Sequence, residues 1–276
     1  MVSRVKVIGG AERQLGRHGC VVDPRADVHP EAAIGPGCRI GPFAVVGADV
    51  VLGEGCVLHG HAVVLGPTRM GPGNEVHPFA CIGGSPQDLR HRGEPTRLLV
   101  GRDNVFREHV TVSRGTAHGG GETRVGDANL LMAYCHVAHD CRIGSHVVMA
   151  NCATLAGHVT VEDHVVFGGL VAVGAFLRIG ESAMLAAGSM IEREVPPFCT
   201  VAGDRARLRA VNRVGLERRC IGQPARAQIK EIFRALKARS DSVERIVARF
   251  RDDPSLSDEA ARMLTFLEGV ERGLTR

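Results

Sequence analysis

Residues Val125–Ile191 decide the fold and read VGDANLLMAYCHVAHDCRIGSHVVMANCATLAGHVTVEDHVVFGGLVAVGAFLRIGESAMLAAGSMI. Every sixth residue of this stretch is apolar, although apolar residues make up only 44% of the chain. A period of six does not suit a helix of 3.6 residues per turn, but it is a multiple of two and therefore suits short strands joined by bends. Three hexads make a coil of about eighteen residues, which predicts a solenoid with these side chains stacked inside. The periodic residues are Val125, Leu131, Val137, Ile143, Met149, Leu155, Val161, Phe167, Val173, Ile179, Leu185 and Ile191.

Composition agrees with a narrow core. The 276 residues include 35 glycines, one tyrosine and no tryptophan, and the net charge is +4. Tight corners need glycine, and a mild positive charge does not indicate nucleic acid as a partner. No apolar run reaches the length of about eighteen residues that a membrane helix needs, and residues 1–10 lack the apolar centre of a signal peptide. We expect a soluble cytoplasmic protein without a membrane span.

Three of the nine cysteines, Cys20, Cys38 and Cys56, are eighteen residues apart and should lie above one another on successive coils. Such a ladder suits a metal or disulfides, but free cysteine also serves as a small buried apolar group. We favour small buried groups, and the odd number of cysteines agrees with a reducing compartment.

The chain divides into three parts. Residues 1–19 carry no hexads and form an N-terminal extension. Residues 20–198 form the solenoid, interrupted by polar, turn-rich excursions at 83–97 and 113–124, the second of which shifts the phase by one residue. Pro196-Pro197 end the hexads, and residues 199–276 change to a helical period. We expect the helices of this C-terminal part to cover the open end of the solenoid, with Asp241 and Glu244 as a capping box.

The coil length places three histidines together. Gly157 lies eighteen residues after His139, so the two should be neighbours on successive coils, with His136 and His158 beside them. All lie off the inward phase and should face outward. Imidazole titrates near neutral pH and can take a proton from a hydroxyl, the adjacent Asp140 can hold the ring, and the backbone N–H of Gly157 can serve as an oxyanion donor. This set suits acyl transfer, but solvated surface histidines and a metal site remain alternatives.

Several motifs together resemble one family. The segments GGSPQDLRHRGEPTR (83–97), NLLMAYCHVAHDCRIG (129–144), NCATLAGHVTVEDHVVFGGLVAV (151–173), VPPF (195–198) and VNRVGLERR (211–219) are similar to the UDP-N-acetylglucosamine 3-O-acyltransferases of lipid A biosynthesis. The resemblance implies a left-handed parallel β-helix followed by a small α-helical domain. It also implies a homotrimer with active sites between subunits, no cofactor, and transfer of a 3-hydroxyacyl group from acyl carrier protein to the sugar 3-hydroxyl.

The resemblance also implies roles for single residues. His139 would be the general base, Asp140 its support and Gly157 the oxyanion donor, with no metal. Those expected to bind substrate are Gln87, Asp88, Arg90, His136 and His158 near the sugar, and Asn212, Arg218 and Arg219 at the nucleotide end.

The chain departs from the family pattern at a few positions. Arg90 replaces a usual lysine, Gly174-Ala175 replace a His-Gln pair, and Val214 replaces a glutamate. These changes leave the identity of the sugar nucleotide open. Ala187 replaces a glycine at the floor of the acyl channel, and we hypothesise that its methyl group shortens the preferred acyl chain.

A basic run and three rival functions complete the sequence-based interpretation. The run suits either a solvated face or docking of acidic acyl carrier protein. The rivals are the sibling UDP-3-O-acylglucosamine N-acyltransferase, an enzyme acting on a 3-amino sugar nucleotide, and a hexad-repeat zinc carbonic anhydrase. The basic residues are Arg205, Arg207, Arg209 and Arg213.

Overall fold

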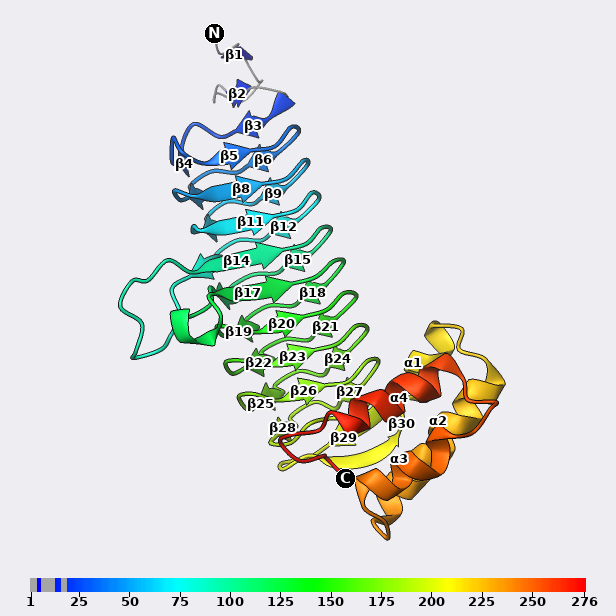
Figure 1. Cartoon of the computed structure of the whole chain (residues 1–276). Coiled ribbons are helices and arrows are strands. Elements are labelled where there is room, and N and C mark those ends of the chain that lie inside the picture. Colours follow the sequence, from blue (N-terminus) through cyan, green and yellow to red (C-terminus); the bar gives the residue numbers. More distant parts are fainter. Residues whose placement is uncertain (1–3, 6–12, 16–18) are drawn as a thin grey trace.

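The computed structural model describes residues 4–5, 13–15 and 19–276. The chain folds into a left-handed parallel β-helix with a small helical unit beside its C-terminal end, so the predicted fold class is confirmed (Figure 1). The rest of the predicted extension 1–19 lies outside the described residues. Its described parts, β1 (Arg4–Val5) and β2 (Arg13–Leu15), pair antiparallel with each other, and β2 pairs with the first strand of the β-helix.

The described strands form three sheets, which the chain visits in turn and which we call A, B and C. Sheet A has 13 strands, sheet B nine and sheet C eight. The parallel strands of sheet A are β3 (Val21–Val22), β6 (Arg39–Ile40), β9 (Val57–Leu58), β12 (Glu75–Val76), β15 (Val105–Phe106), β18 (Leu130–Leu131), β21 (Val148–Met149), β24 (Val166–Phe167), β27 (Met184–Leu185) and β29 (Cys199–Ala202). Those of sheet B are β4 (Asp27–Val28), β7 (Val45–Val46), β10 (Val63–Val64), β13 (Cys81–Gly84), β16 (Thr111–Ser113), β19 (His136–Val137), β22 (Thr154–Leu155), β25 (Ala172–Val173) and β28 (Met190–Ile191). Those of sheet C are β5 (Ala33–Ile34), β8 (Val50–Leu52), β11 (Thr68–Met70), β14 (Arg97–Val100), β17 (Glu122–Val125), β20 (Arg142–Ile143), β23 (Thr160–Val161) and β26 (Arg178–Ile179).

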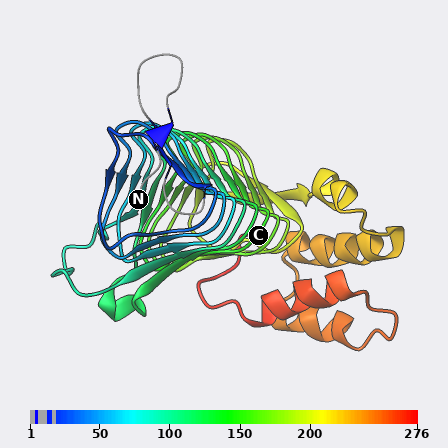
Figure 2. The same cartoon turned by 90° about the horizontal axis from the view of Figure 1, so that it is seen from above.

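The core is the stack of periodic residues. All twelve side chains of the deciding stretch are buried, and those from Val125 to Val173 pair in register with the residue eighteen positions on, as Val137 does with Leu155. At the end of the stack the spacing falls to sixteen, where Leu185 pairs with Val201. Seen from above, the coils repeat a similar outline, each slightly displaced from the one before it (Figure 2). The cysteine ladder is also buried, and each of its thiols donates a hydrogen bond to a glycine carbonyl fifteen residues on.

Both excursions leave the stack at the corner between sheets B and C, which we call corner BC. The first excursion joins β13 to β14, and because of it Val100 pairs with Met70, which lies thirty residues earlier. The second joins β16 to β17, and because of it Val125 pairs with Val100, which lies twenty-five residues earlier. The second contains the short 3-10 helix η2 (Ala117–Gly119). Compared with a regular coil of eighteen residues, the two excursions add twelve and seven residues. Twelve is a multiple of six, so only the second excursion shifts the phase of the hexads.

A ladder of buried asparagines crosses both excursions. The side-chain oxygen of Asn74 accepts from the backbone and side-chain N–H groups of Asn104, and that of Asn104 accepts in the same way from Asn129. Asn129 in turn accepts from the backbone N–H of Val147. Because buried amides are costly without partners, this ladder fixes the register of four successive coils.

The C-terminal part begins with β structure. The segment 199–211, which we expected to be helical, forms β29 and β30 (Arg207–Val211), an antiparallel pair that extends sheet A. The helices that follow are α1 (Arg213–Arg218), α2 (Gln223–Ala238), α3 (Val243–Arg251) and α4 (Asp258–Glu268). The cap of α3 is Ser242 rather than Asp241, because its hydroxyl accepts from the backbone N–H of Arg245.

The helices lie beside the stack instead of covering its end, contrary to our expectation (Figure 1). The last coil is covered by the β29–β30 hairpin and by the final residues, which return after α4. Glu194 pairs with Leu274 in a parallel bridge, and its side chain accepts from the backbone N–H groups of Glu271 and Arg272. Within the described part of the chain, no helix has the length and apolar character needed to cross a membrane.

Candidate active site

The predicted catalytic residues lie at corner BC, directly beside the two excursions. His139 and Asp140 follow β19, so they turn outward where the chain passes from sheet B to sheet C, and Gly157 and His158 occupy the same corner one coil further on. The excursions leave from the coils just before. The corner therefore combines residues from four successive coils.

His139 and Asp140 form a hydrogen-bonded pair. Nδ1 of His139 lies 2.8 Å from Oδ2 of Asp140, and the two side chains are 13% and 1% exposed. A carboxylate accepts the Nδ1 proton, which leaves Nε2 as the basic nitrogen on the open side of the ring.

Asp140 is held by the second excursion. The backbone N–H of Thr116 donates to Oδ1 at 2.9 Å, and its hydroxyl donates to Oδ2 at 2.7 Å. The backbone N–H of Asp140 donates to the hydroxyl of Thr123 at 2.8 Å. Three donors, counting His139, thus fix the carboxylate on both oxygens.

Two glycines allow these close contacts. A Cβ atom on Gly119 would lie 2.3 Å from the carboxylate of Asp140, and one on Gly157 would lie 2.6 Å from Cε1 of His139. Both distances are too short for any side chain, so the backbone itself packs against the pair. The N–H of Gly157 makes no hydrogen bond within the described residues and is free to bind a ligand.

The first excursion brings Asp88 to the same place. Its carboxylate accepts from the backbone and guanidinium of Arg90, and its Oδ2 lies 3.2 Å from Nε2 of His118 and 4.0 Å from Nε2 of His139. Gln87 is exposed, as is Arg90. Asp88 therefore lies close to the basic nitrogen of His139.

His136 and His158 flank the pair on either side. Nδ1 of His136 lies 2.7 Å from the hydroxyl of Thr111. The ring of His158 meets that of His139 edge-on and stacks on Phe176, with centroid distances of 5.3 and 4.3 Å.

The electrostatics favour an ionised acid beside neutral imidazoles. Burial by itself would raise the pKa of Asp140, but the hydrogen bonds from Thr116 and His139 outweigh it, so the pKa is lowered. The hydrogen bonds from Arg90 hold the pKa of Asp88 well below its ordinary value. Burial lowers the pKa of His136 and of His158. Both flanking rings are therefore neutral at pH 7 and can donate or accept a hydrogen bond.

The residues expected at the nucleotide end do not reach this corner. Asn212 caps α1 and donates to the carbonyl of Ser182 at 2.8 Å, while Arg219 pairs with Glu181 and with the hydroxyl of Ser182. Ser182 lies between sheets C and A. Within one chain these residues are thus at a different corner from His139; Arg218 is exposed on the same helix.

The expected acyl ruler occupies the third corner. Ala187 is exposed between β27 and β28, where sheet A passes to sheet B. Of the departures from the family pattern, Gly174 and Ala175 lie at corner BC one coil beyond Gly157, and Val214 is 57% exposed on α1. The predicted site is therefore split over three corners of a single chain.

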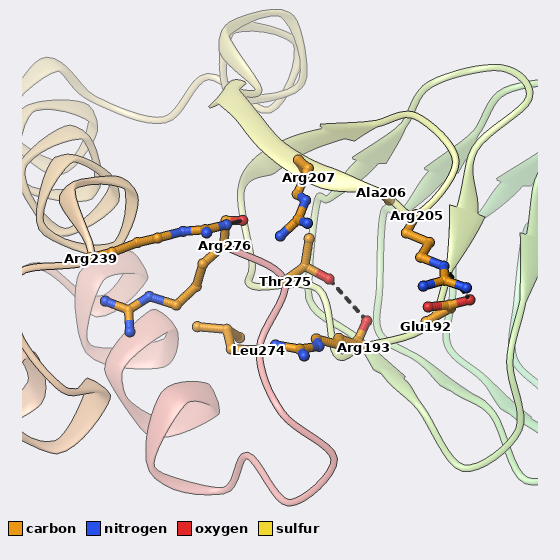
Figure 3. A pocket seen from close by; sticks show the side chains of 9 residues that line it. All are labelled: Glu192, Arg193, Arg205, Ala206, Arg207, Arg239, Leu274, Thr275 and Arg276. Carbon is orange, nitrogen blue, oxygen red and sulfur yellow. Dashed lines mark hydrogen bonds and ion pairs between the residues drawn. The ribbon is translucent and has the colours of Figure 1, made fainter.

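The basic run is divided between two hollows. Arg205 and Arg207 line a cavity of about 340 Å³ below the last coil, where Arg205 pairs with Glu192 at 3.4 Å (Figure 3). Arg209 and Arg213 line a second groove of about 640 Å³ between β30, α1 and α2. The other basic residues of this groove are Arg226, Lys230 and Arg234.

One set of atoms at corner BC has the spacing of a metal site. Ligand atoms of His139, Asp140 and His158 lie within 4.8 Å of one another. The hydrogen bond between Nδ1 of His139 and Asp140 also has the form of a base with its supporting acid.

The sequence interpretation missed Thr116, His118, Gly119 and Thr123. All four lie in or beside the second excursion, where no repeat indicates which residue faces which. A signal was present in the excursion lengths, because two insertions between the same pair of sheets must emerge at the same corner.

The chain is similar to known proteins both in sequence and in fold. Residues 194–275 match the family model described as UDP-N-acetylglucosamine O-acyltransferase, domain 2, and residues 122–157 match the bacterial transferase hexapeptide model. An enzyme of Alkalilimnicola ehrlichii named acyl-[acyl-carrier-protein]–UDP-N-acetylglucosamine O-acyltransferase is 46% identical over 199 residues, which are 71% of this chain and 76% of that enzyme.

Solved structures agree over more of the chain. LpxA from Acinetobacter baumannii is 33% identical with a TM-score of 0.89, covering 92% of this chain and 99% of its own. LpxA from Bacteroides fragilis, titled a UDP-N-acetylglucosamine acyltransferase, is 32% identical with a TM-score of 0.90, covering 92% of this chain and all of its own (100%).

Proposed function

This chain belongs to the acyl-[acyl-carrier-protein]–UDP-N-acetylglucosamine O-acyltransferase family, and on that premise we propose the reaction that it catalyses. It transfers a 3-hydroxyacyl group from acyl carrier protein to the 3-hydroxyl of UDP-N-acetylglucosamine, the first step of lipid A biosynthesis. The observation that carries this proposal is the His139–Asp140 pair with the backbone of Gly157 against its ring.

His139 acts as the general base through Nε2. The sugar 3-hydroxyl gives its proton to Nε2 as its oxygen attacks the thioester carbonyl of the donor, forming a C–O bond. The C–S bond then breaks, and the proton passes from Nε2 to the departing thiolate. Asp140, ionised and held by Thr116, stabilises the imidazolium in between.

Gly157 and Asp88 act on the two reactants. The free N–H of Gly157 donates to the carbonyl oxygen as it becomes an oxyanion, an interaction that is stronger in the transition state than before it. Asp88 accepts from a sugar hydroxyl and holds it beside Nε2, and His136 contacts the same sugar. Neither step requires a metal.

A donor–acceptor assay tests the proposal. Hydroxyacyl carrier proteins of several lengths are offered with UDP-N-acetylglucosamine and with its 3-amino analogue, and ester and amide products are separated by their resistance to base. We expect ester formation that falls at least a thousandfold in His139→Ala. Turnover that survives in this variant would reject the assigned base, and turnover of the amine alone would assign the 3-amino sugar as the acceptor. Acyl transfer that persists after chelator treatment distinguishes the zinc carbonic anhydrase alternative.

A homotrimer is the assembly that best explains the split site. His139, Ala187 and Arg219 lie at three different corners of one chain, so a complete site needs a second copy. The corner between sheets A and B also carries an exposed apolar stripe, a feature that commonly marks an interaction surface. Its exposed apolar side chains are Phe43, Phe79, Tyr134 and Leu170.

Mixing inactive variants tests whether two chains share a site. His139→Ala and Arg218→Glu are each purified, then combined under conditions that exchange subunits. We expect recovery of part of the wild-type activity, because some mixed trimers contain one site with both residues intact. No recovery despite exchange, or a mass of 29.4 kDa by light scattering, would contradict the shared site.

Acyl carrier protein docks on the groove lined by Arg209 and Arg213. The groove combines basic side chains with the apolar surface of Leu216 and Phe233, which suits an acidic, amphipathic partner. Reversing the charge of Arg213 should raise KM for the donor at low salt, whereas an unchanged KM would contradict docking here. The free state of all nine cysteines supports a cytoplasmic location.

A further inference from the structure

We propose that His59, Glu75 and His77 form a binding site for a zinc ion on the outer face of sheet A. The three residues belong to two successive coils: His59 follows β9, Glu75 is the first residue of β12, and His77 follows β12. Their ligand atoms lie within 4.8 Å of one another. This face is distinct from corner BC, and none of the three residues has a part in acyl transfer.

Both histidines direct the same nitrogen at one carboxylate oxygen. Nε2 of His59 lies 2.7 Å from Oε1 of Glu75, and Nε2 of His77 lies 3.2 Å from that same atom. Zinc bonds of about 2.0–2.1 Å at tetrahedral angles place ligand atoms about 3.3 Å apart. The two contacts to the carboxylate oxygen therefore lie within about half an ångström of the spacing that a shared zinc ion imposes.

A second carboxylate orients His77. Oε1 of Glu108 lies 3.5 Å from Nδ1 of His77, and Arg107 holds Glu108 with two hydrogen bonds. Metal-bound histidines commonly have a carboxylate near their second nitrogen, and this contact favours the tautomer with its lone pair on Nε2. The rings of His59 and His77 stack with centroids 4.5 Å apart, so both are held in place by their neighbours.

The site has space for a further ligand. A hollow of about 450 Å³ lies beside it and is lined by Asp23, Arg39, His59 and Glu75. Two imidazoles and one carboxylate favour zinc over magnesium or calcium, which prefer oxygen ligands alone. Three protein ligands leave the fourth position to water.

Zinc here would join two coils near the N-terminal end of the stack. An ion that binds the folded coils and not the unfolded chain stabilises the fold. We therefore expect zinc to raise the unfolding temperature of the full-length protein, without changing the rate of acyl transfer.

Direct binding of Zn²⁺ to the chelator-treated, full-length protein tests the proposal. We expect one tightly bound ion per chain, weakened at least a hundredfold by His77→Ala and by the near-isosteric Glu75→Gln. Co²⁺ in its place should give the absorption of a four-coordinate ion in the wild type and lose it in both variants. Circular dichroism checks that the variants fold.

A second stacked pair provides the control. His146 and His164 also stack on successive coils, at 4.8 Å, but no carboxylate forms an ion pair with either within the described residues. His164→Ala should therefore bind zinc like the wild type. The assignment would be overturned if the wild type bound no zinc at micromolar concentrations. It would also be overturned if Glu75→Gln left zinc binding unchanged, or if His139→Ala abolished it.

Discussion

Thr116 provides the sharpest test of how the catalytic pair is positioned. Its hydroxyl donates to Oδ2 of Asp140, the same oxygen that accepts from His139. A hydrogen bond to a charged group contributes about 1.5–3 kcal/mol. Thr116→Val keeps the shape but removes this donor. If the full free energy of this hydrogen bond is lost from the transition state, kcat falls about 10- to 100-fold, because each 1.36 kcal/mol added to the barrier slows the reaction tenfold.

The substitution should also change how stability depends on pH. The pKa of Asp140 is lowered in the folded protein, so its ionised form stabilises the fold above the unfolded pKa of about 3.9. That stabilisation disappears as the pH falls through the folded-state pKa. Thr116→Val raises the folded pKa, so we expect the variant to be less stable at pH 7 and the difference to shrink below pH 4.

Steady-state kinetics and urea unfolding at several pH values check both effects. KM for the acceptor should stay constant while kcat falls, because Thr116 does not touch the substrate. Thr116→Ser should restore most of the rate. Thr160→Val is the matched control, since the hydroxyl of Thr160 on β23 makes no hydrogen bond within the described residues. A serine variant as slow as the valine variant would refute the role of the hydroxyl.

Three further predictions follow from contacts described above. Gly157→Ala places a methyl group 2.6 Å from Cε1 of His139, so kcat should fall at least a hundredfold with an unchanged circular dichroism spectrum, and a near-normal rate would contradict the assigned contact. Ala187→Gly removes the methyl group from the proposed acyl ruler, so competition between donors should shift toward longer chains; an unchanged preference would end the idea. Asn212→Ala removes the cap of α1 and the bond to Ser182, so unfolding in urea should show a loss of about 1–2 kcal/mol, and no loss would contradict a structural role.

The repeat predicted the body of the protein because one rule governs every coil. Burial of Leu155 follows from that of Val137, and the closeness of Gly157 to His139 follows from the same spacing of eighteen. Periodicity could therefore indicate an outward-facing cluster around His139 without knowledge of any loop.

The same reasoning could not extend to the excursions or to the end of the stack. The contact of Thr116 with Asp140 depends on the path of a non-repeating loop, and no spacing encodes it. The expectation that helices cover the last coil was wrong because the segment 199–211 still had a free edge of sheet A available, and pairing with it satisfied its backbone. Similarly, Asp241 and Ser242 were both suitable caps, and only the local backbone decided between them.

The asparagine ladder has a consequence for how this scaffold can change. Because Asn74, Asn104 and Asn129 hold the coils together from inside, the frame does not depend on the length of the segments that leave it. The stretch 85–96 can then be shortened, extended or exchanged for one from a relative while His139 keeps its position. New acceptor preferences are thus open to evolution, or to an engineer, through one exchangeable loop on an unaltered frame.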